Sequence, residues 1–148
     1  MSAETDLIKL YSARILALAA DMPRTTRLAN PTATAKKRAP LCGSTVTVDL
    51  QVENGIITDY GQDVKACALG QAAASVIGAG IVGLPISDIE KGREQLFNML
   101  KNDGPVPDAP FEGLEVLQPA KEYKNRHASI MLAFDATLDA LQSHQATA

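Results

Sequence analysis

Cysteine and aromatic residues are scarce in this sequence, and tryptophan is absent. The 148 residues include two cysteines, so at most one disulfide can form within the chain, and usage this low is typical of the reducing cytoplasm. Aromatic residues make up 4%, so we expect a core of aliphatic side chains and alanine. The sequence shows no secretory signal pattern, and no apolar run is long enough to span a membrane. We therefore expect a cytoplasmic protein with no membrane contact.

A strong charge of either sign is also missing. Lys and Arg total 14 and Asp and Glu total 17, which gives a formal net charge of −3. This balance gives no electrostatic support for nucleic-acid binding. One local exception is a basic cluster, made up of Arg24, Arg27, Lys36, Lys37 and Arg38. Such a cluster either docks an acidic partner or is a solvated loop, and solvated loops are the more common case.

Length and composition together predict one soluble domain. The 148 residues are 46% hydrophobic and 21% charged, as in ordinary globular proteins. A chain of this size needs neither a disulfide nor a metal to fold. We expect the domain to span residues 1–148. Breakers such as Asn30-Pro31 and Ala39-Pro40 predict a mobile loop over residues 24–40, and we expect a frayed tail over residues 142–148.

Hydrophobic residues at helical spacing predict helices at both ends of the chain. The first starts at Thr5 or Asp6, ends before Asp21, and carries an apolar face of Leu7, Ile8, Tyr11, Ile15 and Leu18. The last covers about residues 120–141, with an apolar face of Tyr123, His127, Ile130, Phe134, Leu138 and Leu141.

Two more helices are predicted between these. The small residues at 67–79 indicate a helix that packs closely against a sheet. Ser87-Asp88-Ile89-Glu90 has the form of a capping box. The helix that follows it stops at Asn102-Asp103-Gly104, where glycine ends the periodic pattern.

A change of period predicts the sheet. Residues 45–53 alternate between apolar and polar, as a half-buried strand does. Asn54-Gly55 follows at once, and it is a strong hairpin signal because both residues tolerate positive φ. Residues 56–60 then form the return strand, and residues 61–66 supply a third short strand. The order of helix, antiparallel strands and further helices predicts an α+β fold.

The chemistry that the sequence offers is concentrated on two cysteines. Cys42 comes just before the first predicted strand, and Cys67 stands where the alanine-rich helix begins. A thiol at a helix N-terminus is favoured as the thiolate, which binds metal or attacks a sulfur donor. A lone cysteine is otherwise more often a small buried hydrophobe. The sequence has no phosphate-binding glycine loop, nucleophile elbow or paired zinc-finger cysteines.

Four segments resemble, in their order along the chain, the IscU, NifU and SufU family of scaffolds for iron–sulfur cluster assembly. They are Pro40-Leu41-Cys42-Gly43, the Asn54-Gly55 hairpin, Cys67-Ala68-Leu69-Gly70-Gln71-Ala72-Ala73-Ala74-Ser75, and the segment from Arg126 to Phe134, which is similar to the SufU branch. The resemblance implies a three-stranded antiparallel sheet packed against four to five helices. It also implies a protein that is not an enzyme. Such a protein receives sulfur from a cysteine desulfurase, builds a transient iron–sulfur cluster or binds iron or zinc, and serves recipient apo-proteins.

The resemblance also implies a site of three cysteines and an aspartate. Cys42 and Cys67 take the places of the first two cysteines. The aspartate falls on Ser44, and the third cysteine falls on Ser129. A serine hydroxyl stays protonated near neutral pH and is a poor ligand for iron or zinc, so two of the four expected ligands remain.

Other side chains are candidate metal ligands. His127 lies two positions from Ser129, which is about 200° around a helix, and a neutral imidazole binds both iron and zinc. It also belongs to the apolar stripe of the last helix, where a histidine is more often a core residue bonded to a carbonyl. Asp63 and Glu53 are further candidates on or near the predicted strands, with weaker claims.

Three hypotheses stay open. In the first, the protein is a scaffold or sulfur acceptor, and Cys42 and Cys67 hold iron, an iron–sulfur cluster, zinc or a persulfide; a homodimer would bring four thiolates to one cluster. In the second, the chain is a metal-free interaction or regulatory module that binds a cysteine desulfurase or another assembly partner. In the third, a thiol enzyme uses His127 as its base, although nothing in the spacing places a base beside either cysteine. The sequence favours the first hypothesis.

Overall fold

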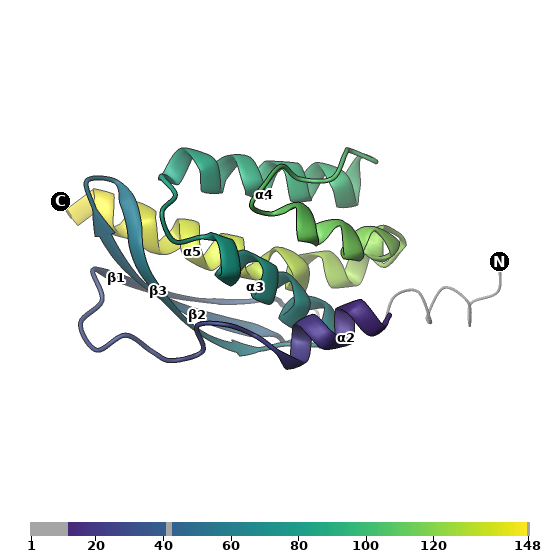
Figure 1. The fold of residues 1–148 in the computed structure, drawn as a ribbon, viewed down its shortest axis with the longest axis horizontal. Coiled ribbons are helices and arrows are strands. Elements are labelled where there is room, and N and C mark those ends of the chain that lie inside the picture. Colours follow the sequence, from purple (N-terminus) through teal and green to yellow (C-terminus); the bar gives the residue numbers. More distant parts are fainter. Residues whose placement is uncertain (1–11, 41–42, 148) are drawn as a thin grey trace.

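The chain forms a three-stranded antiparallel sheet with its helices packed mainly on one face, so the predicted α+β class is confirmed (Figure 1). A computed structural model describes residues 12–40 and 43–147. The elements are α2 (Ala13–Ala20), β1 (Ala33–Arg38), β2 (Thr45–Glu53), β3 (Ile56–Lys65), α3 (Ala68–Gly80), α4 (Ile86–Lys101), the 3₁₀ helices η1 (Glu112–Glu122) and η2 (Lys124–Arg126), and α5 (His127–Thr147). None of the helices in this part of the chain has an apolar stretch long enough to cross a membrane.

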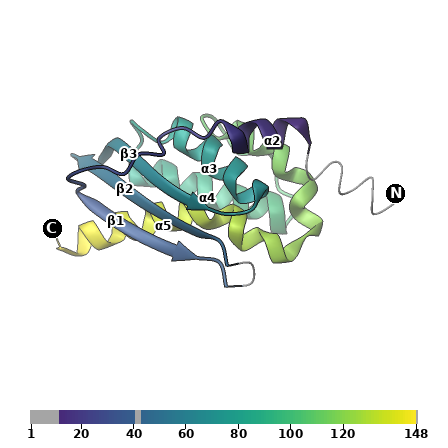
Figure 2. The ribbon, with the colours of Figure 1, turned by 90° about the horizontal axis from the view of Figure 1, so that it is seen from below.

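The sheet has the order β1-β2-β3, and α5 and α3 cover its inner face. Figure 2 shows α5 running behind β1 and β2, with α3 behind β3. Ala72, Ala73 and Ala74 of α3 are fully buried. Their small side chains let α3 approach both the sheet and α5 closely. The predicted aliphatic, alanine-rich core is therefore confirmed.

The hairpin at Asn54-Gly55 is confirmed, but the predicted third strand after it is wrong. Asn54 and Gly55 have φ values of 53° and 75°, and β2 pairs with β3 on either side of them. Residues 61–65 continue β3 and do not form a separate strand. Gly61, where the separate strand was predicted to begin, lies inside β3, and its missing side chain makes room for another segment. A Cβ there would lie 2.4 Å from the carbonyl oxygen of Thr26, in a segment that crosses the sheet.

The third strand is β1, and it lies in the region predicted as a loop. Its register runs from Ala33 opposite Leu50 to Arg38 opposite Thr45. The loop prediction for residues 24–40 is therefore wrong for Ala33–Arg38. As an edge strand, β1 is bonded on one side only, and lysines are common on such edges because they discourage pairing with another chain. Its side toward α5 carries Ala33, Ala35 and Lys37, so the alternation is too weak to stand out in the sequence.

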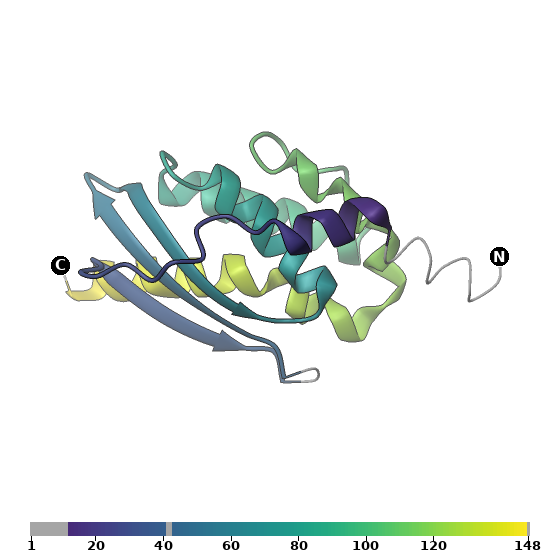
Figure 3. The same cartoon turned by 60° about the horizontal axis from the view of Figure 1, so that its bottom comes forward.

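The segment between α2 and β1 crosses the outer face of the sheet, over β3 and β2 (Figure 3). The buried carboxylate of Asp49 on β2 fastens it there. That carboxylate accepts hydrogen bonds from the guanidinium of Arg27 at 2.6 and 3.0 Å and from the backbone N–H of Leu28 at 3.0 Å. The hydroxyl of Thr34 on β1 donates to it at 2.7 Å. One carboxylate thus joins the crossing segment, β1 and β2.

Among the helices, α3 begins and ends close to where the sequence predicts. The start predicted for the first helix lies outside the described residues, and α2 begins after Ser12, whose Oγ accepts from the N–H of Ile15 at 3.3 Å. The capping box at Ser87 does not form, because α4 begins at Ile86 with Pro85 as its N-cap. Ser87 therefore lies inside the helix.

The last helix starts later than predicted, at His127. The residues before it form 3₁₀ turns, and Tyr123 interrupts them with a non-helical ψ of 73°. The imidazole Nε2 of His127 lies 3.0 Å from the carbonyl oxygen of Ala120, which ties the turn to the beginning of α5. At its other end α5 continues to Thr147, through most of the range predicted as a tail.

Candidate functional site

Cys67, Ser129 and Ser44 converge from three elements that are far apart in the sequence. Cys67 precedes α3, Ser129 lies in the first turn of α5, and Ser44 directly precedes β2. The hydroxyl of Ser129 donates to Oγ of Ser44 at 3.0 Å, and Sγ of Cys67 lies 3.7 Å from Oγ of Ser129. Both serines are buried, and Cys67 is partly exposed. We call these three residues the cysteine–hydroxyl cluster.

Ser44 is held at the cluster by the tight turn between β1 and β2. The N–H of Ala39 donates to the carbonyl of Ser44 at 2.8 Å, and the N–H of Gly43 donates to the carbonyl of Ala39 at 2.9 Å. Ala39 is buried and anchors the turn. Cys42, one of the two predicted thiolate ligands, belongs to this turn by sequence but lies outside the described residues.

Cys67 is the N-cap residue of α3, with an extended backbone at φ −66° and ψ 169°. Burial raises the pKa of its thiol, but the backbone amide of Gly70, the hydroxyl of Ser129 and the side chain of Arg126 together bring the pKa below its ordinary value. These groups stabilise negative charge on sulfur, as expected at the positive end of a helix. The thiolate predicted from the position of Cys67 is therefore supported by its surroundings.

Gly70 lets α3 and α5 meet at the cluster. A Cβ at this position would lie 2.6 Å from Oγ of Ser129 and 2.9 Å from Cβ of Ala66. Both distances are too short for ordinary contacts, so only glycine fits without a shift. The glycine of the Cys67-Ala68-Leu69-Gly70 motif thus positions the hydroxyl that faces the thiol.

The other candidate ligands do not join Cys67 in a metal site, and Glu53 is exposed at the end of β2. His127 is 2% exposed and its Nε2 is engaged by the carbonyl of Ala120. Burial lowers its pKa, which keeps the ring neutral. Asp63 is exposed on β3, opposite Thr47. Among the residues that the structure describes, no three His, Cys, Asp or Glu side chains gather closely enough to hold a metal ion.

Arg126 is a site residue that the sequence did not single out. Its side chain helps to lower the pKa of the Cys67 thiol, and Arg126 lies three positions before Ser129 in the sequence. Residues three apart share a helical face, so this spacing from the predicted position of the third cysteine was the signal that could have identified it.

The described donor set suits an anionic sulfur better than a metal cation. It consists of one thiol, two hydroxyls joined by a hydrogen bond, and the guanidinium of Arg126, which helps to lower the pKa of the thiol. Protonated hydroxyls are poor ligands for zinc or iron, and the positive charge of Arg126 opposes a bound cation. A thiolate or a persulfide gains from the same groups.

Known proteins of the NifU-like and IscU type share the fold of this chain over most of their length. The profile of the NifU-like N terminal domain matches residues 10–144. The iron–sulfur cluster assembly scaffold protein IscU of Thermotoga maritima is 24% identical over 133 residues, covering 90% of this chain and 93% of its own. The crystal structure of a nitrogen-fixing NifU-like protein (N-terminal) from Brucella abortus superposes with a TM-score of 0.93 at 40% identity, covering 97% of this chain and 99% of that one. A putative SUF-system scaffold protein from Fervidobacterium islandicum shares the fold, with a TM-score of 0.80 at 20% identity over 90% of this chain and 98% of that one.

Proposed function

Because this chain belongs to the family of NifU-like N-terminal domains, we propose that it works in iron–sulfur cluster assembly through the thiolate of Cys67. The Thermotoga maritima relative is named as a scaffold for this process. The observation that supports the role of Cys67 is its environment. Its thiol sits at the start of α3, is partly exposed, and has its pKa lowered by Gly70, Ser129 and Arg126 against the effect of burial.

The reaction that this environment supports is acceptance of sulfur from a persulfide, as a cysteine desulfurase would supply it. The thiolate of Cys67 attacks the outer sulfur of the donor's persulfide, and a new S–S bond forms as the donor's S–S bond breaks. The donor cysteine leaves as a thiolate, so no further oxidant or reductant is needed. The chain is consumed stoichiometrically and is not an enzyme in this step. The reducing cytoplasm would keep its thiols available.

Iron, an iron–sulfur cluster or zinc is the cargo that the family role implies. One chain offers two thiolates, from Cys42 and Cys67, and Ser44 and Ser129 supply hydroxyls where further ligands are expected. Two copies with two cysteines each would provide the four thiolates that a cluster commonly takes. We therefore propose that any cluster is held between two copies, or between this chain and a recipient apo-protein.

A second candidate function follows from the hydrogen bond between Ser129 and Ser44. The hydroxyl of Ser129 donates to that of Ser44, and a protein that held metal would need metal ligands at these two positions. The same fold would then serve as a metal-free interaction or regulatory module that occupies a cysteine desulfurase. The two functions differ in whether Cys67 takes up sulfur.

The experiment is to incubate the purified chain with a cysteine desulfurase and cysteine and to measure its intact mass without reductant. The sulfur-acceptor role predicts a gain of one sulfur atom that Cys67→Ser abolishes, and Cys42→Ser shows how far the second thiol contributes. Anaerobic iron–sulfur reconstitution with both variants, followed by visible absorption and metal content, tests the cargo. Formation of a desulfurase complex without any sulfur uptake or cluster would establish the interaction module instead.

A further inference from the structure

The basic cluster noted in the sequence is divided by the fold into paired and unpaired cations. Three of its five members are paired with carboxylates: Arg24 with Asp59 at 3.6 Å, Arg27 with Asp49 at 2.6 Å and Lys37 with Asp139 at 4.0 Å. Lys36 and Arg38 are exposed, and neither forms an ion pair with another described residue. The cluster is therefore not a uniformly solvated loop.

The strand register adds Lys65, an exposed lysine that likewise forms no ion pair within the described part of the chain. Arg38 on β1 lies opposite Thr45 on β2, and Thr45 lies opposite Lys65 on β3. Residues directly opposite one another share a face of the sheet, and two strand spacings separate the outer pair by roughly 10 Å. Lys36 follows on the same face, two residues from Arg38. We call Lys36, Arg38 and Lys65 the outer basic strip.

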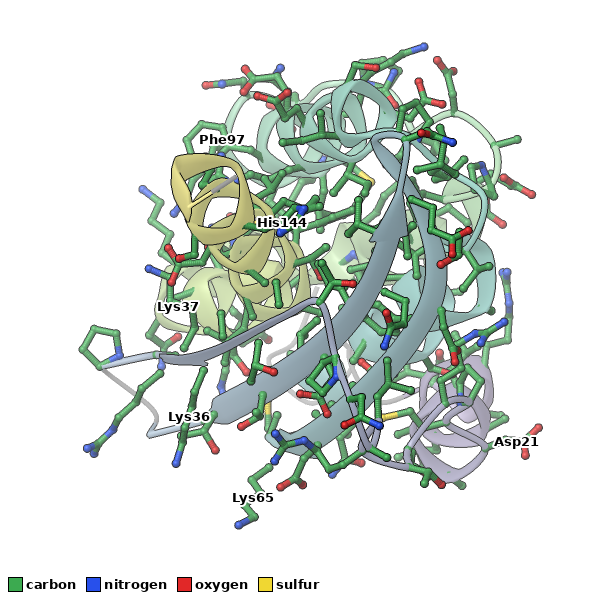
Figure 4. The ribbon with its side chains drawn as sticks, turned by 90° about the vertical axis from the view of Figure 1, so that its left-hand side faces the viewer. Asp21, Lys36, Lys37, Lys65, Phe97 and His144 are labelled. Atoms are coloured by element: carbon green, nitrogen blue, oxygen red, sulfur yellow. The ribbon has the colours of Figure 1, made fainter. Side chains whose placement is uncertain are left out.

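Figure 4 shows the direction in which these side chains point. Lys36 and Lys65 extend to the same side of the sheet, away from α5, while Lys37 lies on the α5 side near its carboxylate partner. One carboxylate, Asp63, shares a cross-strand row with Lys36. The strip thus has a net positive charge in a chain whose formal net charge is −3.

The outer basic strip borders the cysteine–hydroxyl cluster. Lys65 is two residues before Cys67, and Arg126 is among the groups that lower the pKa of the thiol. A terminal nitrogen of Arg38 would lie 3.9 Å from a Cβ at Gly43, in the turn that carries Ser44. Cations from β1, β3 and η2 therefore flank the partly exposed sulfur and the turn that carries Ser44.

We propose that the outer basic strip docks an acidic segment of the protein that exchanges sulfur with Cys67. This inference rests on the sulfur-acceptor role proposed above. Complementary charges raise the rate of encounter and fix the orientation of a partner. A segment rich in carboxylates matches the outer basic strip, whose three cations form no ion pair with any residue that the structure describes. Nucleic acid is the poorer match, because sustained binding takes more phosphate contacts than a strip of this size makes, in a protein of negative net charge.

The test uses two synthetic peptides of equal length, each with a single cysteine persulfide, flanked by glutamates in one and by glutamines in the other. Transfer of sulfur to the full chain is followed by intact mass, and Cys67 is identified by peptide mapping. At low ionic strength the glutamate peptide should react roughly tenfold or more faster, and salt should remove the difference. The triple variant Lys36→Glu, Arg38→Glu, Lys65→Glu should lose this preference.

The matched control is a triple variant with the same change of charge on α2 and α4: Arg14→Glu, Lys91→Glu, Lys101→Glu. It should keep the preference for the glutamate peptide. Equal rates for both peptides with the unaltered chain, or equal loss in both triple variants, would overturn the inference. Tighter binding of a single-stranded oligonucleotide than of the glutamate peptide, measured by fluorescence anisotropy at the same salt, would also overturn it.

Docking is separable from sulfur transfer. Binding of the glutamate peptide without its persulfide is measured by anisotropy for the unaltered chain, Cys67→Ser and the outer-strip triple variant. Binding by the first two and not by the third supports the docking surface, even if Cys67 accepts sulfur from neither peptide and the proposed function fails. Absence of binding by all three overturns the docking surface, whatever Cys67 does.

Discussion

The hydroxyl of Ser129 donates a hydrogen bond to the hydroxyl of Ser44 across 3.0 Å. The family resemblance places a cysteine and an aspartate at these two positions. The two serines come from α5 and from the turn before β2, and they meet beside Cys67. The fold therefore brings together two positions to which the resemblance assigns ligands, and both carry hydroxyls.

Restoring the two ligands should restore metal binding. The double variant Ser44→Asp, Ser129→Cys adds a carboxylate and a thiolate next to Cys67, a donor set that suits zinc. We expect about one zinc per chain after purification and dialysis against zinc, measured by elemental analysis, and much less in the unaltered protein. Ser143→Cys, which adds a thiol on the exposed side of α5, is the control. A double variant that binds no more zinc than this control would show that the cysteine–hydroxyl cluster cannot hold a metal ion even with these ligands present.

The thiol of Cys67 should ionise at a lower pH than an ordinary cysteine, and Arg126 should contribute to the difference. Its positive charge favours the thiolate, so Arg126→Gln should raise the pKa of Cys67 and slow its alkylation near pH 7 by a few-fold. The measurement is the pH profile of iodoacetamide labelling, resolved by peptide mapping. Lys124→Gln is the control, because it removes a positive charge two positions before Arg126 that is not among the groups named for the pKa of Cys67. An identical profile for the unaltered chain and Arg126→Gln would contradict the role of Arg126.

The carboxylate of Asp49 should stabilise the fold above acidic pH. Burial alone raises its pKa, but hydrogen bonds from Arg27, Thr34 and Leu28 hold the pKa below the ordinary value of 3.8. The ionised form is therefore favoured by folding, and its contribution is lost as the pH falls through the folded-state pKa. Asp49→Asn should lower the free energy of unfolding by about 2 kcal/mol at pH 7, and the difference should shrink below about pH 4.

Urea unfolding at several pH values measures this effect of Asp49. Asp59→Asn is the matched control, because Asp59 pairs with Arg24 at 3.6 Å and both side chains are substantially exposed. Such pairs contribute little, so the control should unfold almost as the unaltered protein does. A loss in Asp49→Asn that stays constant down to acidic pH would argue against the ionised carboxylate as its cause.

Gly70→Ala should destabilise the protein and disturb the cluster together. The added methyl would meet Oγ of Ser129 and Cβ of Ala66 at 2.6 and 2.9 Å, and overpacking of this kind costs about 1–3 kcal/mol. The control is Gly113→Ala, where the nearest atoms belong to Val76 at 3.4 Å. Thermal unfolding gives the stability, and the labelling rate of Cys67 reports the site. Equal stability of the two variants would mean that α3 and α5 have room to separate.

Local signals explain which elements the sequence predicts well. The β2–β3 hairpin and α3 each depend on a short pattern, Asn54-Gly55 in one case and a run of small residues in the other. The strand β1 has no such pattern, since its polar and basic residues suit an exposed edge as well as a loop. The start of α5 depends on the contact between His127 and the carbonyl of Ala120, which no periodicity within the helix predicts.

In the candidate site, too, some features could be predicted from the sequence and others could not. The meeting of Cys67, Ser44 and Ser129 agrees with the positions that the family resemblance gives them, because the motifs keep their order along the chain. The pairing of charges does not follow from the sequence. Arg27 and Lys36 are both basic residues of the same cluster. Arg27 forms an ion pair with Asp49, whereas Lys36 forms no ion pair with any carboxylate of the described residues. Arg27 reaches Asp49 from the segment that crosses the sheet, whereas the register of β1 places Lys36 on the exposed edge.

The bond from Thr34 to Asp49 has a consequence for the whole edge of the sheet. A slip of β1 by one residue would carry Thr34 away from Asp49 and exchange the two faces of the strand, turning Lys36 and Arg38 toward the core. The crossing segment, held by the same carboxylate, would lose its anchor at the same moment. The buried carboxylate of Asp49 thus fixes the register of β1, and through that register it determines which cations face an incoming molecule.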